Sequence, residues 1–381
     1  MTLPITFIEA TEVWLELSST SLESRFSSAG SAWNATLNQS CLEAILAWLQ
    51  EDYEANPRPF PNLAALPSYW EFVNGTPIEM NNTRFLIVPS EAMDLSEMRI
   101  PQEWVDIPNW IADYYLAVQV NPDDESLRIW GYTTHKNLKD KGNYNRSDRT
   151  YSLTQANLIP DINILWVSQE LCPSEETRAA VSPLPNLSLE RANNLLERLG
   201  NSDLMLPRLV LSFEDWGALL SHSGWRKQLY QRRIGQSPWS ILDWLQQGVS
   251  EFAQQFGWQK MEMQPSLIGA RGIEEATTSS LIIRQLSIAG QPYELRIIPS
   301  GNQEENVWRF ELRSSLASGL IPGGFKLRLL TEDLQPFENN EDTAEAAVEL
   351  LYVEVALESG EGLVWEVEPI PNNYEREILR F

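Results

Sequence analysis

The stretch that decides the fold runs from Arg99 to Leu153, RIPQEWVDIPNWIADYYLAVQVNPDDESLRIWGYTTHKNLKDKGNYNRSDRTYSL. Within it, Ala112–Asn121 is a nearly continuous apolar run that predicts a strand. The Pro-Asp-Asp sequence that follows predicts a turn, and Leu127–Thr134 predicts the returning strand. The polar residues after Thr134 predict a loop or a short helix, and TYSL, which ends at Leu153, predicts another paired strand.

The residues before this stretch predict a hairpin that leads into it. Tyr69–Gly75 alternates apolar and polar residues and ends in Asn-Gly, a strong hairpin turn signal. Thr83–Ala92 is expected to be the returning strand, and the EWVDI segment between Pro101 and Pro108 is expected to be extended. Short strands at this spacing predict a small antiparallel β-barrel-like domain over residues 67–167.

On both sides of this domain, apolar residues recur at the spacing of a helix instead of the two-residue spacing of a strand. Residues 1–66 form a predicted helical segment, because Leu42, Ile45, Leu46 and Leu49 recur at helical spacing. Its expected N-cap is Asn38 or Ser40. Residues 168–262 form a second predicted helical segment, and residues 263–280 a linker or an irregular entry to the next domain.

Three patterns support helices in residues 168–262. One apolar stripe, stopped by Gly200-Asn201, consists of Leu189, Ala192, Leu195, Leu196 and Leu199. The helical pattern after Leu209 is expected to break at Gly224. Another helix is expected to begin at the N-cap Ser237, with Pro238 as its first residue.

Residues 281–381 read as about seven short strands separated by Gly, Pro and Asn turns. That pattern is typical of an antiparallel β-sandwich. The predicted fold class is therefore α+β with several domains: an N-terminal β-barrel-like domain with flanking helices, a central helical segment and a C-terminal sandwich.

Composition narrows the class of partner. The formal net charge is −25, and 53 acidic residues stand against 28 lysines and arginines. So acidic a chain repels phosphate backbones, which makes nucleic acid a poor partner. The start of the chain lacks the basic and apolar regions of a signal peptide, and no apolar run is long enough to span a bilayer. We expect a cytoplasmic protein without membrane contact, and its oligomeric state stays open.

Two C-terminal runs and one N-terminal run resemble a known family. They are LIPGGFKLRLLTEDLQPFENNED (Leu320–Asp342), VALESGEGLVWEVEP (Val355–Pro369) and PQEWVDIPNWIADYYLAVQVN together with WGYTTHKNLK. Together they resemble the cyanobacterial family known as the domain of unknown function DUF1822. The resemblance implies a cyanobacterial source and carries no catalytic residues. Members of this family are often encoded beside sigma-70-like factors, so the resemblance also implies a regulatory role.

No linear motif for catalysis, cofactor binding or metal binding appears. GxxxxGK[ST], GxGxxG, GxSxG and HExxH are all absent. The two histidines, His135 and His222, have no partner at helical spacing, and His135 is expected to lie in an exposed loop. Cys41 and Cys172 lie far apart and are expected to be reduced thiols. No catalytic, cofactor or metal residue is predicted, and enzymatic activity stays open.

The main cationic cluster is the candidate partner-binding site. It consists of His135, Lys136, Lys139, Lys141, Tyr144, Arg146 and Arg149. A cationic loop with interleaved tyrosines is suited to an acidic peptide, single-stranded nucleic acid or another part of this chain. A second basic and aromatic cluster, around Trp225–Arg233, is expected to be helix packing with snorkelling arginines, with a partner surface as the alternative.

These observations favour a non-enzymatic regulatory or scaffold protein that acts through protein–protein contacts. Thr331–Phe381 contains fourteen acids and two arginines, so a basic partner, such as the DNA-binding region of a sigma factor, fits that surface. Two alternatives remain. One is a hydrolase without a linear motif, and the other is a nucleic-acid-binding module that uses the Lys136–Arg149 loop.

Overall fold

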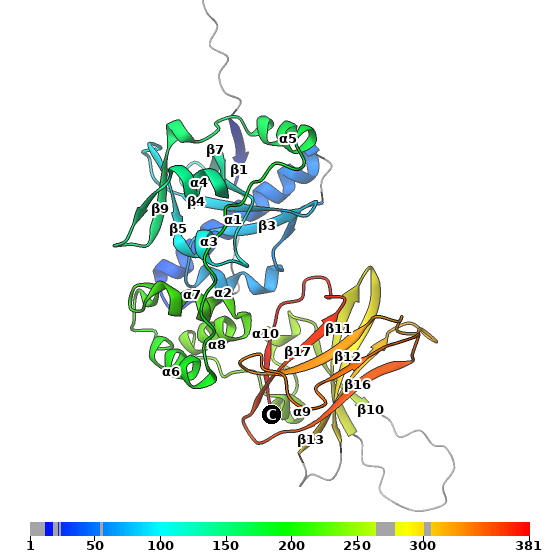
Figure 1. Ribbon diagram of the computed structural model, residues 1–381. Helices are drawn as coiled ribbons and strands as arrows, with labels where there is room; N and C mark the ends of the chain where they lie inside the picture. The colour runs from blue at the N-terminus through cyan, green and yellow to red at the C-terminus, as the bar shows by residue number, and fades with distance from the viewer. Residues whose placement is uncertain (1–11, 18–21, 23, 54–55, 264–278, 301–305) are drawn as a thin grey trace, which may run out of the picture. The chain divides into compact units, whose positions relative to one another are not determined.

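The computed structural model describes residues 12–17, 22, 24–53, 56–263, 279–300 and 306–381 (Figure 1). The chain divides into two compact units, each of which is described by itself. The first unit comprises Met1–Leu187, Ala192–His222 and Arg232–Gly235, and the second comprises Ser188–Arg191, Ser223–Gln231 and Gln236–Phe381. The finer five-segment division proposed from the sequence stays a prediction.

A six-stranded sheet forms the centre of the first unit, in the order β1-β7-β6-β4-β3-β2. Its strands are β1 (Val13–Glu16), β2 (Arg58–Pro59), β3 (Thr76–Met80), β4 (Thr83–Ser90), β6 (Tyr114–Asn121) and β7 (Ser126–Thr134). All neighbours pair antiparallel except β4 and β6, which are parallel. The register of β6 and β7 shifts at Ala117/Val118, so Trp130 is the extra residue of a β-bulge.

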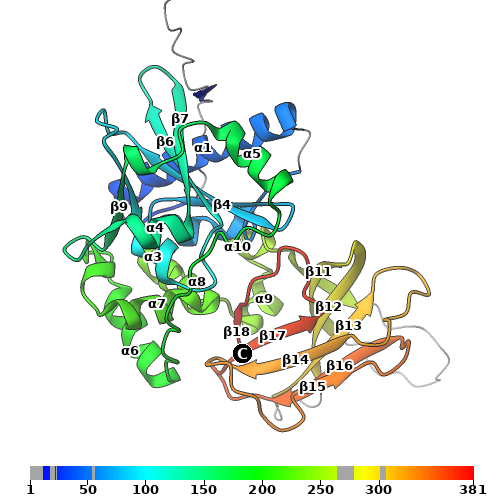
Figure 2. The same ribbon diagram turned by 45° about the horizontal axis from the view of Figure 1, so that its top comes forward.

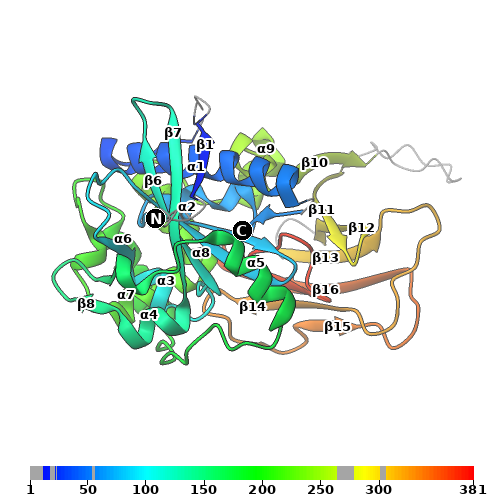
Figure 3. The same ribbon diagram turned by 90° about the horizontal axis from the view of Figure 1, so that it is seen from above.

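The long helix α1 (Ala29–Tyr53) covers one face of this sheet, and Figure 3 shows it crossing behind the strands. Its side chains Leu42, Ile45 and Leu49 share a core with apolar residues of β3, β4, β6 and β7. The helix begins earlier than the predicted caps, because Asn38 lies inside it. The Asn38 amide is satisfied by Asn34, Asn74, Gly75 and Thr76, so it does not interrupt the helix.

A three-stranded sheet in the order β5-β9-β8 lies in the same unit. Its strands are β5 (Glu97–Pro101), β8 (Asn143–Asn145) and β9 (Thr150–Thr154). Short helices accompany it: α2 (Pro67–Trp70), α3 (Gln102–Asp106) and α4 (His135–Lys141). Later in the chain come α5 (Ile162–Leu171), α6 (Leu189–Leu199), α7 (Phe213–Ser221) and α8 (Ser223–Arg233). Residues of α6 and α8 belong to both units.

Two antiparallel sheets dominate the second unit, and Figure 2 shows several of their strands. The five-stranded sheet has the order β10-β11-β12-β13-β16, and the four-stranded sheet has the order β15-β14-β17-β18. The strands are β10 (Trp258–Met263), β11 (Ser279–Ile288), β12 (Gln291–Ser300), β13 (Val307–Ser314), β14 (Lys326–Thr331), β15 (Glu341–Thr343), β16 (Leu350–Ala356), β17 (Gly362–Glu368) and β18 (Ile378–Arg380). Two short helices, α9 (Ile241–Gln247) and α10 (Glu251–Gln254), precede them.

The structure confirms an α+β fold with several sheets and antiparallel sheets toward the C-terminus. The strands predicted at Ala112–Asn121 and Leu127–Thr134 are β6 and β7, and the predicted leucine stripe is α6. The N-terminal sheet differs from the predicted antiparallel barrel, because β4 and β6 run parallel and because β1 and β2 extend the sheet beyond residues 67–167. Of the predicted linker 263–280, residues 264–278 lie outside the described residues.

The predicted hairpin at Tyr69–Gly75 is wrong. Tyr69 and Trp70 end the helical turn α2, which has Pro67 at its first position. The hairpin instead joins β3 to β4 through Asn81 and Asn82, whose φ angles are 50° and 64°. Asparagine tolerates this left-handed conformation, which two-residue hairpin turns of the primed types require.

Other boundaries also differ from the predictions. EWVDI is not extended, since it forms most of helix α3. The helix expected to start at Ser237 begins at Ile241, because the hydroxyl of Ser240 accepts the Asp243 N–H at 3.2 Å. The break before α8 falls at His222 rather than Gly224.

Candidate functional site

The predicted cationic cluster spans α4, β8 and the turn between β8 and β9. His135 does not lie in an exposed loop: its side chain has 0% exposure, so that prediction is wrong. Its Nδ1 accepts the Ala179 N–H at 3.0 Å, and its Nε2 lies 2.9 Å from the Val105 carbonyl. Nε2 must therefore carry the proton, and burial lowers the pKa of the ring. His135 is a neutral interior group that ties α4 to two other segments.

The lysines of the cluster divide into paired and exposed side chains. Lys136 lies 2.6 Å from the Glu176 carboxylate at the surface. Lys139 donates to Asp106 at 2.8 Å and to the Tyr151 hydroxyl at 2.9 Å. Burial alone would lower the pKa of Lys139, but its bonds to Asp106 and Tyr151 raise that pKa overall. Lys139 is thus already neutralised by a neighbouring acid.

Arg149 serves the structure of the first unit. Its guanidinium donates to the backbone carbonyls of Arg208 and Leu211. In return, Arg208 donates to the carbonyls of Asp148 and Arg149, at 2.9 and 3.0 Å. The two arginines therefore hold the β8–β9 loop against the segment that precedes α7.

Lys141, Tyr144 and Arg146 remain at the surface. Tyr144 is 42% exposed, and its hydroxyl donates to Gln102 at 2.8 Å. Within the described ranges, neither Lys141 nor Arg146 lies within 4.0 Å of a carboxylate oxygen. Of the predicted site, two cations without a carboxylate partner among the described residues and one tyrosine therefore remain exposed on and near the edge strand β8.

A buried ion pair that the sequence reasoning missed lies behind this loop. Glu103 has 0% exposure, and its carboxylate accepts from Arg208 at 2.9 and 2.6 Å. The indole N–H of Trp216 donates to the same carboxylate at 2.8 Å. Because both donors are side chains of the first unit, the arrangement fixes α3 to the segment before α7 and to α7 itself. A single acid between Gln102 and Trp104 gave no signal for it in the sequence.

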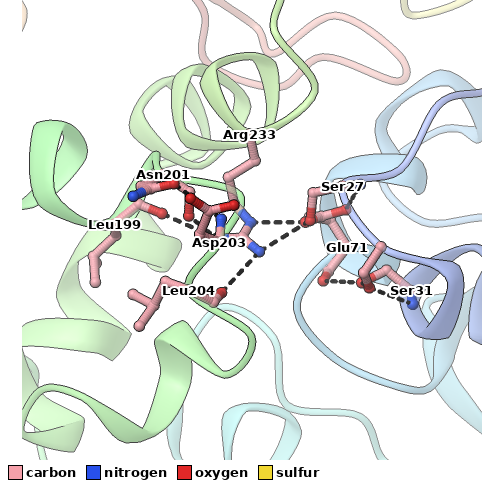
Figure 4. A network of polar contacts seen from close by, with 9 residues as sticks. Ser27, Ser31, Glu71, Leu199, Asn201, Asp203, Leu204 and Arg233 are labelled. Carbon is pink, nitrogen blue, oxygen red and sulfur yellow. Dashed lines mark hydrogen bonds and ion pairs between the residues drawn. The ribbon is translucent and has the colours of Figure 1, made fainter.

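Figure 4 shows a second buried network, centred on Arg233 and Glu71. The Nε–H of Arg233 donates to Glu71 at 2.8 Å. Its other four N–H groups donate to Ser27 Oγ and to three backbone carbonyls, those of Leu199, Asn201 and Leu204, at 2.9–3.1 Å. All five donors of the guanidinium are satisfied. The network closes the C-terminal end of α6 and leaves no donor for a ligand.

The cluster around Trp225–Arg233 is helix packing, as predicted, but Arg226, which lies in the second unit, is buried rather than snorkelling to the surface. Arg226 and Lys227 both pair with the buried Glu375, the lysine at 3.2 Å. Burial lowers the pKa of Lys227 to about 8. Lys227 also lies 4.4 Å from the ring centre of Phe256. Arg226 and Lys227 therefore belong to the interior packing of the second unit.

A cavity of about 480 Å³ opens in the first unit where the carboxyl end of β4 and the middle of β6 meet β5. Trp130, the bulged residue, is part of its wall. Two acids lie at this cavity, but both already have partners: Asp94 accepts from Ser96 at 2.9 Å, and Glu97 accepts from Arg99 at 2.6 Å. Among the described residues, no group of three His, Cys, Asp or Glu side chains is placed to hold a metal ion.

An apolar stripe on α5 is the most distinctive exposed feature of the first unit. Ile164, Val167 and Leu171 are 47%, 52% and 74% exposed. Their spacing places them on one face of the helix. The opposite face buries Ile162 and Leu165. The α5 stripe, as we call these three exposed residues, therefore presents large aliphatic side chains to solvent from a helix already anchored by its other face.

Fold and surface together define a class: an α+β protein with two compact units, whose buried charges are mostly paired and whose apolar α5 stripe faces solvent. Residues 16–380 match the family model described as "Protein of unknown function (DUF1822)". The chain belongs to this family. No curated protein and no solved structure matches it. Within the described residues, no helix is both long and apolar enough to cross a bilayer.

Proposed function

We propose that this protein is a non-enzymatic regulatory or scaffold protein of the cytoplasm, which binds a protein partner of basic character. The observation that supports this function is the α5 stripe. Contiguous exposed apolar surface is costly in water and commonly marks a contact with another protein. Three large aliphatic side chains on one exposed helix face are suited to such a contact.

The charge around the stripe indicates the character of the partner. No lysine or arginine occurs from residue 150 to residue 177, a range that contains all of α5. The same range contains Asp161, Glu170, Glu175 and Glu176, and the last three are exposed. An apolar stripe flanked by carboxylates favours a partner with apolar and cationic residues. The basic DNA-binding region of a sigma-factor-like protein has this character.

The test is affinity capture from an extract of the native host with three forms of the protein. The stripe variant carries Ile164→Gln, Val167→Gln and Leu171→Gln. The matched control carries Leu316→Gln, Leu320→Gln and Ile370→Gln, which replace three exposed aliphatic residues of the second unit. Because all six side chains are exposed, both variants are expected to fold as the wild type does.

We expect one or more proteins to be retained by the wild type and the control but lost with the stripe variant. Retention should also weaken as salt is raised, because part of the attraction is between exposed charges. Identical capture by all three forms, or no enrichment above background, would contradict the proposed function.

A further inference from the structure

A groove of about 530 Å³ lies between β1 and the C-terminal half of α1 in the first unit. Its lining consists of Leu15, Glu16, Glu43, Ala44, Ala47, Trp48, Glu51 and Asp52. Four of these eight residues are acids, four are apolar, and none is cationic. This feature, which we call the α1–β1 groove, is distinct from the α5 stripe.

The α1 residues of the groove form two adjacent rows along the helix. Glu43, Ala47 and Glu51 recur every four residues, and Ala44, Trp48 and Asp52 form the parallel row beside them. Residues four apart lie on the same face of a helix. The alanines leave room for a backbone to approach. Carboxylates lie at both ends of the first row and at the C-terminal end of the second.

β1 supplies the other wall and an open strand edge. It is the terminal strand of the six-stranded sheet and pairs with β7 on one side. Among the described residues, no strand pairs with its second edge. Figure 3 shows β1 beside β7, with α1 extending past both of them. An unpaired edge presents backbone N–H and C=O groups that can take an additional strand.

We propose that the α1–β1 groove binds an extended, basic segment of a partner protein by strand addition to β1. Backbone hydrogen bonds to the β1 edge would hold the segment in register. Its apolar side chains would contact Leu15, Ala44 and Trp48, and its lysines or arginines would pair with Glu16, Glu51 and Asp52. Alternation of apolar and cationic residues follows from the two-residue period of a strand.

The proposal rests on the proposed function only in that the ligand is a protein segment; the surface is a different one. Charge complementarity favours a basic occupant over the N-terminal residues 1–11 of this chain. Those residues contain one acid and no lysine or arginine. A second copy of this chain, which is itself strongly acidic, is likewise disfavoured.

The probe is the synthetic peptide acetyl-Lys-Val-Lys-Ile-Lys-Val-Lys-amide, and its binding to the full chain is measured by fluorescence anisotropy at low salt. Two altered peptides accompany it. In one, alternate backbone nitrogens are methylated so that one strand edge cannot donate. In the other, the same residues are reordered so that lysines and aliphatic residues form two blocks.

Two triple variants test the role of local charge. The groove variant carries Glu16→Gln, Glu51→Gln and Asp52→Asn. The control carries Glu345→Gln, Glu349→Gln and Glu358→Gln, which remove three exposed acids of the second unit and give the same net charge. Because exposed ion pairs contribute modestly, we expect about a tenfold loss of affinity in the groove variant and less than about a twofold loss in the control.

Ala47→Gln fills the groove without changing the charge, so it should also weaken binding of the alternating peptide. The methylated peptide should not bind, and the stripe variant should bind like the wild type. The proposal is overturned by equal binding of the methylated or the reordered peptide, by equal losses in both triple variants, or by no binding. Two further outcomes would also overturn it. Displacement of the probe by a peptide of residues 1–11 would show that the chain's own N-terminus occupies the groove. An elution volume in size-exclusion chromatography that corresponds to a dimer, measured without the probe, would show that a second copy occupies it.

Discussion

Two buried clusters, one in each unit, balance their charges differently. In the first, Arg233 uses all five of its N–H groups, and the carboxylate of Glu71 accepts from it and from Ser27. In the second, Arg226 and Lys227 share the single carboxylate of Glu375. One cation faces one carboxylate in the first cluster, and two cations face one carboxylate in the second. The comparison shows that burial of a lysine or arginine says little about stability until its partners are counted.

The largest expected effect is the loss of the saturated arginine. Arg233→Met leaves the buried Glu71 without its counter-charge and removes the guanidinium donors of three backbone carbonyls, so we expect the free energy of unfolding to fall by about 3–5 kcal/mol. Urea denaturation followed by tryptophan fluorescence measures the change. Arg232→Met, at the exposed neighbouring residue, is the matched control and should change stability by less than about 0.5 kcal/mol. If both variants lowered the free energy of unfolding equally, the Arg233 cluster would not be the stabilising network that the comparison requires.

Glu103→Gln tests the other balanced pair of the first unit. The amide keeps the shape and an acceptor for Trp216, but it leaves the Arg208 charge without a counter-charge. We expect a loss of about 2–3 kcal/mol, because a half-buried guanidinium then lacks its anion. Thermal and urea unfolding check this value against Glu170→Gln, at an exposed acid. If Glu103→Gln lowered the free energy of unfolding no more than Glu170→Gln does, the Arg208 side chain would have moved into solvent in the variant.

Lys227→Met tests the unbalanced cluster of the second unit. The folded pKa of Lys227 is about 8, below its ordinary value of 10.5. Between these values the unfolded chain holds a proton that the folded chain has lost, so stability should rise with pH from about 8 to 10, by about 1–3 kcal/mol. Glu375 keeps Arg226 as a partner in the variant, which should therefore lose this rise without being strongly destabilised.

Urea unfolding at pH 7.0, 8.5 and 10 would measure the slope for the wild type, for Lys227→Met and for the exposed control Lys141→Met. The control should retain the wild-type slope. A slope that is the same in all three proteins would show that Lys227 stays charged in the folded state.

The smallest expected effect has the opposite sign and belongs to the first unit. Burial raises the pKa of the Cys41 thiol from 9.0 to about 12. Above pH 9 the unfolded chain loses this proton while the folded chain retains it, so stability should fall by about 1 kcal/mol between pH 9 and pH 10. Cys41→Ala should abolish this fall, whereas Cys172→Ala, at the exposed cysteine, should not. Parallel pH curves for the two variants would contradict the assignment.

Periodic apolar patterns predicted the elements whose partners lie nearby in the sequence. β6, β7 and the strands from β11 to β18 other than β15 were found because alternation and turn residues are local signals. α6 was found because its five-residue stripe keeps the helical period. The apparent strand at Tyr69–Gly75 was wrong because tertiary burial of Tyr69 and Trp70 outweighs alternation over so short a stretch. The parallel pairing of β4 and β6 is a topological fact that local residue patterns do not encode.

The candidate site was less predictable than the fold. Lysines and arginines can be counted in a sequence, but their partners come from residues far away. Glu176 neutralises Lys136, Asp106 neutralises Lys139, and distant carbonyls hold Arg149. The α5 stripe could have been noticed as a helix with apolar residues on both faces, whereas the α1–β1 groove required two elements to be brought together by the fold.

The pairing of β1 with β7 has a consequence for the order in which the protein forms. Val13 pairs with Ile129, and the other β1 residues pair with residues of β7 that are similarly far along the chain. The β7 residues therefore leave the ribosome long after their β1 partners. At the usual synthesis rate of roughly 5–20 residues per second, the first strand waits several seconds for its partner. During translation, both edges of β1 are open at once, and a cellular factor that shields this segment would act before the sheet is complete.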